Sequence, residues 1–264
     1  MAKALIGGLR KQGHAAQDIH VVEPVADLRD KLAKDYGVRC TDSIDSTAMN
    51  CEVWVLAVKP QVLRDAIVPL KDKLTSQLVI SVAAGIRSKD ISRWLGDHNK
   101  VVRTMPNTPA LIGAGITGLY AGADVDQQGR DIADKILKAA GATLWVNDES
   151  QMDAITAISG SGPGYVFYFI EALQQAAEEA GFDAVSARKL AVQTVLGSAQ
   201  LAEQSTDSVA VLRERVTSKG GTTEAALKSL DADAVAAAII KATKVAQTRG
   251  TQLGIELGDQ LVKD

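Results

Sequence analysis

The chain has little of several features on which common functions depend. Aromatic residues make up only 4% of its 264 residues, which argues against stacking platforms for nucleic-acid bases. The formal net charge is −3, too small to attract nucleic acid or an acidic membrane surface. No run approaches the about 20 apolar residues of a membrane-spanning helix, and no apolar leader opens the chain. We therefore expect a globular, cytoplasmic protein with no nucleic-acid or membrane partner.

Cysteine and histidine are also scarce. Cys40 and Cys51 form no CxxC pair, so we expect two ordinary thiols in a reducing compartment and no metal site. The three histidines, His14, His20 and His98, lie outside every candidate site described below. The chemistry should therefore not need a histidine base, which argues against a lactate-type alcohol dehydrogenase.

The chain has two parts with different patterns. Up to residue 148, short apolar runs alternate with amphipathic stretches, which predicts a parallel, doubly wound sheet with helices on both faces. The predicted strands are residues 19–23, 52–58, 78–84 and 101–104, and the predicted helices are residues 25–35, 61–74, 88–95 and 127–140. The run 52–58 is almost entirely apolar, so we expect it to be buried on both faces.

Residues 149–264 lack strand signals and are predicted to form a helical domain. Apolar residues recur at helical spacing from residue 165 and again from residue 190, and further helices are expected at 208–216, 224–230 and 232–257. Several of these helices are apolar on more than one face. A domain of this size has a limited interior, so we expect a second copy of the chain to bury the excess.

The opening of the chain differs from that of a usual dinucleotide-binding unit, which begins with a strand, a GxGxxG turn and a helix. Residues 1–6 resemble that helix, and residues 19–23 resemble the second strand. We therefore expect a sheet without its first strand. The two strands that would flank it should then have no pairing strand on the side facing the gap. Two explanations are open: a start placed at an internal methionine, or a shortened protein with weakened cofactor binding.

Two loops are candidates for cofactor binding because ligands of open α/β sheets bind beyond the carboxyl ends of strands. Ala57, Val58, Lys59 and Pro60 follow the most apolar strand, and Pro60 suits a first helical turn. The segment 83–84 is Ala-Ala, small enough for a flat ring such as nicotinamide to approach the backbone. A plain strand-to-helix turn, or close helix packing, would explain each loop as well.

Two further segments carry polar groups next to proline or glycine. Asn107 lies between two prolines after a strand, where it could bind an amide ligand or form an Asx-turn with its own backbone. Residues 159–164, Ser-Gly-Ser-Gly-Pro-Gly, precede the first long helix of the second domain. A simple capping loop would need fewer glycines.

The most informative stretch is Ser218-Lys219-Gly220-Gly221-Thr222-Thr223, which opens an amphipathic helix. Free N–H groups at a helix start can bind an anion such as a phosphate or a substrate carboxylate. The alternative is a helix capped by Thr222, although capping alone does not require two glycines.

Four of these motifs, at residues 57–61, 105–110, 159–163 and 218–223, resemble those of pyrroline-5-carboxylate reductases in order and spacing. The resemblance covers essentially the whole chain. It implies a Rossmann-like, mostly parallel sheet without its first strand and Gly-rich loop, followed by an all-α dimerisation domain. It also implies reduction of Δ1-pyrroline-5-carboxylate to L-proline with NADPH or NADH, the last step of proline biosynthesis, by a homodimer that is often assembled into a decamer.

The resemblance also implies roles for particular residues. The residues expected to contact the cofactor are Ala57, Val58, Lys59, Pro60, Ala83 and Ala84, with Asn107 near the nicotinamide. The N–H groups of Gly220, Gly221, Thr222 and Thr223 should hold the substrate carboxylate, and Thr223 should hydrogen-bond the ring nitrogen, with Ser218, Glu149 and Ser161 lining the pocket. Lys219 and Gly164 depart from the proline and alanine common in the family.

Two other functions remain open. A β-hydroxyacid dehydrogenase would share the architecture, but it uses a lysine in a glycine-rich helix that is not found here. A scaffold that dimerises without binding cofactor would lack turnover, and cofactor titration would identify it.

The first testable prediction concerns the choice of cofactor. Glu23 ends the second strand of the usual unit, where a carboxylate accepts from a ribose 2′-hydroxyl and repels a 2′-phosphate. We therefore expect KM for NADH to lie below KM for NADPH in steady-state assays. A KM for NADPH well below that for NADH would contradict this assignment.

Overall fold

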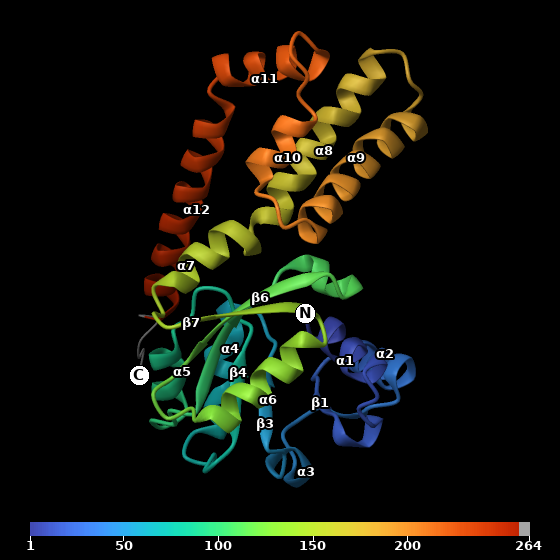
Figure 1. Cartoon of the computed structure of the whole chain (residues 1–264). Helices are drawn as coiled ribbons and strands as arrows, with labels where there is room; N and C mark the ends of the chain where they lie inside the picture. The colour runs from blue at the N-terminus through green and yellow to red at the C-terminus, as the bar shows by residue number, and fades with distance from the viewer. Residues whose placement is uncertain (259–264) are drawn as a thin grey trace. The chain divides into compact units, whose positions relative to one another are not determined.

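The computed structural model describes residues 1–258, which fall into two compact units (Figure 1). The first unit contains residues 1–161 and the chain from Ala246 onward, and the second contains Gly162–Val245. The chain therefore passes from one unit to the other twice. The domain boundary expected between residues 148 and 149 stays a prediction.

The first unit is built on a mostly parallel five-stranded sheet, as predicted. Its strands are β3 (Val53–Leu56), β4 (Leu78–Ser81), β5 (Val101–Met105), β6 (Gly115–Ala121) and β7 (Gly141–Val146), hydrogen-bonded in that order. Only the pair β5–β6 is antiparallel. No strand was predicted at β6, whose two glycines weaken the strand signal; pairing with β5 and β7 on its two sides holds it in the sheet.

A separate two-stranded sheet precedes it, made of β1 (His20–Val22) and β2 (Arg39–Thr41). Within residues 1–258, β1 pairs only with β2, and β3 only with β4. The prediction that the strands next to the missing first strand have no pairing strand on that side is therefore confirmed for β1 and β3. The expectation that β3 is buried on both faces is wrong: Val55 is 38% exposed and only Leu56 is buried, because β3 is an edge strand.

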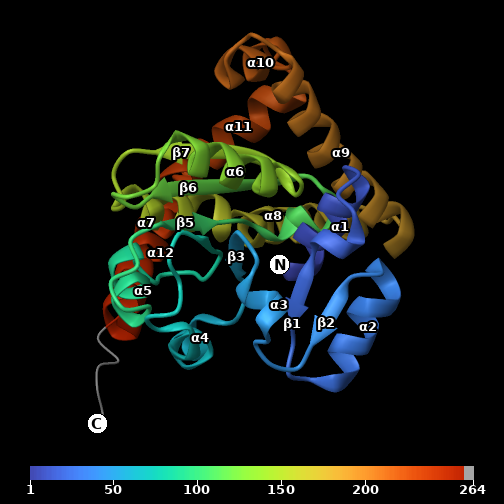
Figure 2. The ribbon, with the colours of Figure 1, turned by 90° about the horizontal axis from the view of Figure 1, so that it is seen from below.

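Helices cover both faces of the five-stranded sheet (Figure 2). One face packs against α4 (Pro60–Ile67) and α5 (Ser88–Trp94), and the other against α1 (Ala2–Lys11) and α6 (Gln127–Lys138). Alternate strand residues divide between the two cores, as a pleated sheet requires: Val79 and Val101 face the first, and Ile80 and Val102 the second. The other helices before Gly160 are α2 (Ala26–Tyr36), α3 (Ser46–Met49) and α7 (Gln151–Ile155).

The second unit is entirely helical over its described residues, as predicted. It contains α8 (Gly162–Glu179), α9 (Ala184–Gln204), α10 (Val209–Arg215), α11 (Thr222–Ala232) and the first part of α12 (Val235–Gly258). No residue of α8, α10 or α11 is buried. In α8 the consecutive residues Phe167, Tyr168 and Phe169 are 63%, 77% and 54% exposed, so apolar surface extends around the helix. Among residues 1–258, no helix is both long enough and apolar enough to cross a bilayer.

A second prediction follows from the contact between α1 and α6. A Cβ on Gly8 would lie 2.0 Å from the carbonyl oxygen of Ala139, whereas one on Gly7 would meet only the movable ring of Tyr36 at 3.3 Å. We expect Gly8→Ala to lower the free energy of unfolding by about 1–3 kcal/mol through overpacking. The neighbouring control, Gly7→Ala, should be neutral or stabilising by up to ~1 kcal/mol because alanine favours the helix. Equal urea midpoints for the two variants would contradict this packing.

Candidate active site

Three candidate loops lie together at one edge of the sheet. The strands β3, β4 and β5 are parallel neighbours, with Leu56 paired to Ser81 and Ser81 to Arg103. Their carboxyl ends therefore share an edge, and the loops that begin at residues 57, 82 and 106 leave the sheet side by side. The backbone N–H of Val82 donates to the carbonyl of Leu56 at 3.2 Å. This is the edge at which open α/β sheets bind ligands.

The loop 82–87, between β4 and α5, approaches other backbone closely. The hydroxyl of Ser81 accepts from the N–H of Ala83 at 3.3 Å, and Ala83 is buried. Gly85 has a φ of +82°, and a Cβ on Gly254 of α12 would lie 2.7 Å from its carbonyl oxygen. The loop is therefore held by packing on small residues. Ala83 belongs to the hydrophobic core, so the contact of segment 83–84 with a nicotinamide ring stays a prediction.

The loop 57–60 begins α4, as the sequence predicted. Lys59 is the N-cap residue and Pro60 is the first helical residue. Val58 is 40% exposed, and Lys59 is exposed as well. The loop therefore offers accessible backbone and one cation, which fits the phosphates of a dinucleotide.

Glu23 follows β1, at the carboxyl end of the two-stranded sheet. Its carboxylate accepts from the N–H of Val25 at 3.0 Å, and its carbonyl accepts from the guanidinium of Arg29 at 3.0 Å. A dinucleotide ribose bound here would meet a carboxylate with an arginine close by.

Asn107 joins two of the sequence motifs. Its Nδ2 donates to the carbonyl of Ser159 at 3.1 Å, and its Oδ1 accepts from the N–H of Ile116 at 3.0 Å. Both partners are distant in sequence, so the alternative of a local Asx-turn is wrong. A Cβ on Gly160 would lie 2.5 Å from the terminal methyl of the Met105 side chain, so the two residues are in close contact. Segments 105–110 and 159–161 are therefore packed together.

Ser161 is the last residue of the segment 159–161, and its backbone N–H is already hydrogen-bonded. Residues Thr156–Gly160 form one turn of π-helix, and the N–H of Ser161 donates to the carbonyl of Thr156 at 2.8 Å. Turns of this type are rare and are frequent at functional sites. The role of Ser161 in substrate binding stays a prediction.

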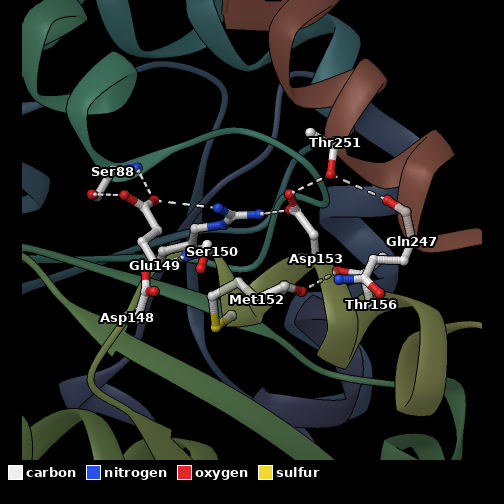
Figure 3. A network of polar contacts seen from close by, with 10 residues as sticks. Ser88, Asp148, Glu149, Ser150, Met152, Asp153, Thr156, Gln247 and Thr251 are labelled. Carbon is white, nitrogen blue, oxygen red and sulfur yellow. Dashed lines mark hydrogen bonds and ion pairs between the residues drawn. The ribbon is translucent and has the colours of Figure 1, made fainter. Parts of the chain in front are cut away.

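Arg103 pairs with two carboxylates in a polar network inside the first unit. Figure 3 shows Glu149 and Asp153 in this network, with Ser88 and Thr251 beside them. Its side chain is 4% exposed and reaches Glu149 Oε1 at 3.3 Å and Asp153 Oδ1 at 3.1 Å. Glu149 also accepts from the N–H of Ser88 at 2.7 Å and from its hydroxyl at 2.9 Å. Asp153 accepts from the hydroxyl of Thr251 on α12 at 2.9 Å. The network thus connects β5, α5, α7 and α12.

No motif in the sequence points to Ser88, Asp153 or Thr251, and Arg103 was not predicted as a site residue. One signal was present, since Arg103 is a charged residue within the apolar run 101–104. A charge in such a strand must have partners in the fold. The two carboxylates that pair with Arg103 lie 46 and 50 residues away along the chain and carry no local signal.

The turn 218–224 lies in the second unit. Gly220 has a φ of +75°, and a Cβ on Gly221 would lie 2.6 Å from the hydroxyl oxygen of Ser218, so both glycines are needed. Gly221 is the N-cap of α11, and therefore the alternative in which Thr222 caps the helix is wrong. Glycine has no side chain, so it cannot occupy the N–H groups of the first turn, which also lack acceptors within the helix.

Glu224 folds back onto this turn. Its carboxylate accepts from the N–H of Gly220 and forms an ion pair with Lys228 at 2.8 Å. The hydrogen bond from Lys228 and that from Gly220 lower the pKa of Glu224. The N–H of Gly220 is therefore already paired with a carboxylate of the chain itself, and its role toward a substrate stays a prediction.

The thiols and two of the histidines have ordinary surroundings. Cys40 and Cys51 are free, and burial raises the pKa of each thiol. His20 bonds to the hydroxyl of Thr41 at 2.9 Å, and His98 bonds to the carbonyl of Gln77 at 2.8 Å. These bonds serve the structure at a distance from the candidate loops.

Comparison with known proteins decides the family. The chain is 43% identical to the pyrroline-5-carboxylate reductase of Pseudomonas aeruginosa over 98% of its own length and 95% of that protein. It is 40% identical to the enzyme of the same name from Haemophilus influenzae, covering 96% of this chain and 94% of that one. The chain belongs to the pyrroline-5-carboxylate reductase family.

Domain models and solved structures agree with this membership of the reductase family. Residues 149–253 match the domain model "Pyrroline-5-carboxylate reductase dimerisation", and residues 1–85 match "NADP oxidoreductase coenzyme F420-dependent". A pyrroline-5-carboxylate reductase structure from Coxiella burnetii superposes with a TM-score of 0.91 at 41% identity, covering 96% of this chain and 94% of that one. The Plasmodium falciparum reductase, solved with NADP bound, gives a TM-score of 0.84 at 28% identity over 95% of this chain and 93% of that one.

Proposed function

We propose that this chain reduces Δ1-pyrroline-5-carboxylate to L-proline with NADPH or NADH as hydride donor, the last step of proline biosynthesis. The observation that carries the proposal is 43% identity over nearly the whole chain to a protein named for this activity. The NADP oxidoreductase match over residues 1–85 supports a nicotinamide cofactor.

The substrate carboxylate is assigned to the turn that opens α11. The N–H groups of Thr222 and Thr223 open an 11-residue helix, where the partial positive charge favours an anion, whereas the N–H of Gly221 already donates to the carbonyl of Ser218. Thr222 and Gly220 are exposed. The backbone contact of Glu224 with Gly220 supports this assignment because it is the same kind of bond that a substrate carboxylate would accept.

Positioning is the main task that the reaction sets for the protein. A protonated cyclic imine is already electrophilic, so hydride addition depends on orientation more than on a strong acid. The hydroxyl of Thr223 is assigned to the ring nitrogen, where it holds the C=N bond in a fixed direction. Ser218 completes the same turn, and its carbonyl accepts from the N–H of Gly221 at 3.0 Å.

The cofactor is assigned to the carboxyl edge of the sheet in the first unit. Backbone at 57–60 is placed to bind phosphate and ribose, and the small residues at 83–84 leave space for the nicotinamide ring. Asn107 anchors the neighbouring loop to Ser159. When bound, the nicotinamide supplies the hydride; the residues of the chain hold it and keep competing groups away.

A third prediction tests the role of Thr223. Thr223→Ala should lower kcat/KM for pyrroline-5-carboxylate about 10-fold or more, which corresponds to roughly 1.4 kcal/mol of transition-state stabilisation. Thr223→Ser retains the hydroxyl and should recover most of the loss. Kinetics of Thr223→Ala equal to those of the unmodified chain would remove Thr223 from the mechanism.

A fourth prediction concerns assembly. The match to a dimerisation domain and the exposed apolar residues of α8 support a homodimer, and a decamer is the larger assembly that we assign. Gel filtration with light scattering should show no stable monomer at micromolar concentration, because a monomer would leave the apolar faces of α8 in water. A monodisperse monomer would contradict the proposal.

A further inference from the structure

The buried cation of Arg103 depends on two carboxylates. A guanidinium this far from water is costly unless hydrogen-bonded to opposite charge. Two different nitrogens of its guanidinium satisfy that need: Nη1 donates to Glu149 and Nη2 donates to Asp153. A lysine has one ammonium on a flexible stem and cannot reproduce this two-sided geometry.

Glu149 provides a cap for α5 from a distant part of the chain. The first N–H groups of a helix have no acceptor within it, and the N-cap residue Arg87 makes no side-chain cap. Glu149, which follows β7, instead accepts from both the N–H and the hydroxyl of Ser88. Glu149 therefore holds the start of α5 in place, and Arg103 holds Glu149 in place.

The start of α5 is also the end of the loop 82–87. At its beginning the loop is attached to the sheet, where the hydroxyl of Thr104 donates to the carbonyl of Ser81 at 2.8 Å. At its end the attachment to α5 runs through Ser88 and Glu149. Because Arg103 and Thr104 are adjacent on β5, one strand fixes both ends of the loop.

We propose that Arg103 and Glu149 are positioning residues for the cofactor loop 82–87, acting through Ser88. Glu149 then serves the reaction by holding this loop, and not by touching the substrate as the family resemblance implied. The inference rests on the proposed function only in assigning the loop to the nicotinamide cofactor.

The test compares Ser88→Ala and Glu149→Gln in the full chain, with KM measured separately for the cofactor and for pyrroline-5-carboxylate. Each variant should raise the cofactor KM about 3- to 10-fold, as expected when one charge-assisted hydrogen bond is lost and its effect is partly transmitted. KM for pyrroline-5-carboxylate should stay unchanged. Ser88→Thr retains the hydroxyl and should restore the cofactor KM. An effect of Glu149→Gln on pyrroline-5-carboxylate KM alone would overturn the inference.

Two further variants separate positioning from general stability. Thr251→Val removes the bond to Asp153 on the other side of Arg103 and should lower the melting temperature without changing the cofactor KM. Lys138→Gln removes an exposed ion pair with Asp134 on α6 and should change neither quantity. If Thr251→Val raised the cofactor KM as much as Ser88→Ala, the network would act only through stability, and the inference would be wrong.

Direct cofactor titration makes the outcome independent of turnover. Quenching of NADPH or NADH fluorescence gives Kd for each variant without substrate. If the unmodified chain binds cofactor but does not reduce pyrroline-5-carboxylate, the proposed function fails, while a weaker Kd for Ser88→Ala still supports the inference. Identical Kd values for Ser88→Ala, Glu149→Gln and the unmodified chain would overturn it.

Discussion

The first unit depends on one buried charge. Arg103 projects from the middle of the sheet toward two carboxylates, and through them it holds the starts of α5 and α7 and the last helix. Removing one member of a buried ion pair typically costs about 3–5 kcal/mol, because the remaining charge keeps its desolvation penalty. Asp153 precedes the first crossing to the helical unit, and Thr251 follows the second. Asp153 and Thr251 are hydrogen-bonded to each other within the first unit.

Glycines allow close contacts between several elements of the first unit. Gly8 allows α1 to touch α6, Gly160 admits the Met105 side chain, and Gly254 brings α12 against Gly85. At Gly8 and Gly254 a methyl group would collide with a backbone carbonyl oxygen, whereas at Gly160 it would displace the movable end of the Met105 side chain. The glycines allow close backbone approach, and the network around Arg103 holds the end of the loop 82–87 at Ser88.

The reaction proposed for this chain needs few catalytic residue types. A protonated imine needs orientation, a group that binds its carboxylate and a nearby hydroxyl, which we assign to the start of α11 and its two threonines. The cofactor side needs accessible backbone at the carboxyl edge of a parallel sheet, which β3, β4 and β5 supply. Histidine and metal ligands have no assigned part in this chemistry.

The sequence by itself determined the alternation of strands and helices, the all-helical second part and the family, because apolar periodicity and short glycine-rich motifs are local properties. It also located Pro60 at a helix start. Tertiary structure alone decided that β3 is an edge strand, that β6 runs antiparallel, and that Gly221 caps α11 in place of Thr222. It likewise assigned Asn107 and Glu149 their partners, since a buried polar group is satisfied by residues that only folding brings near.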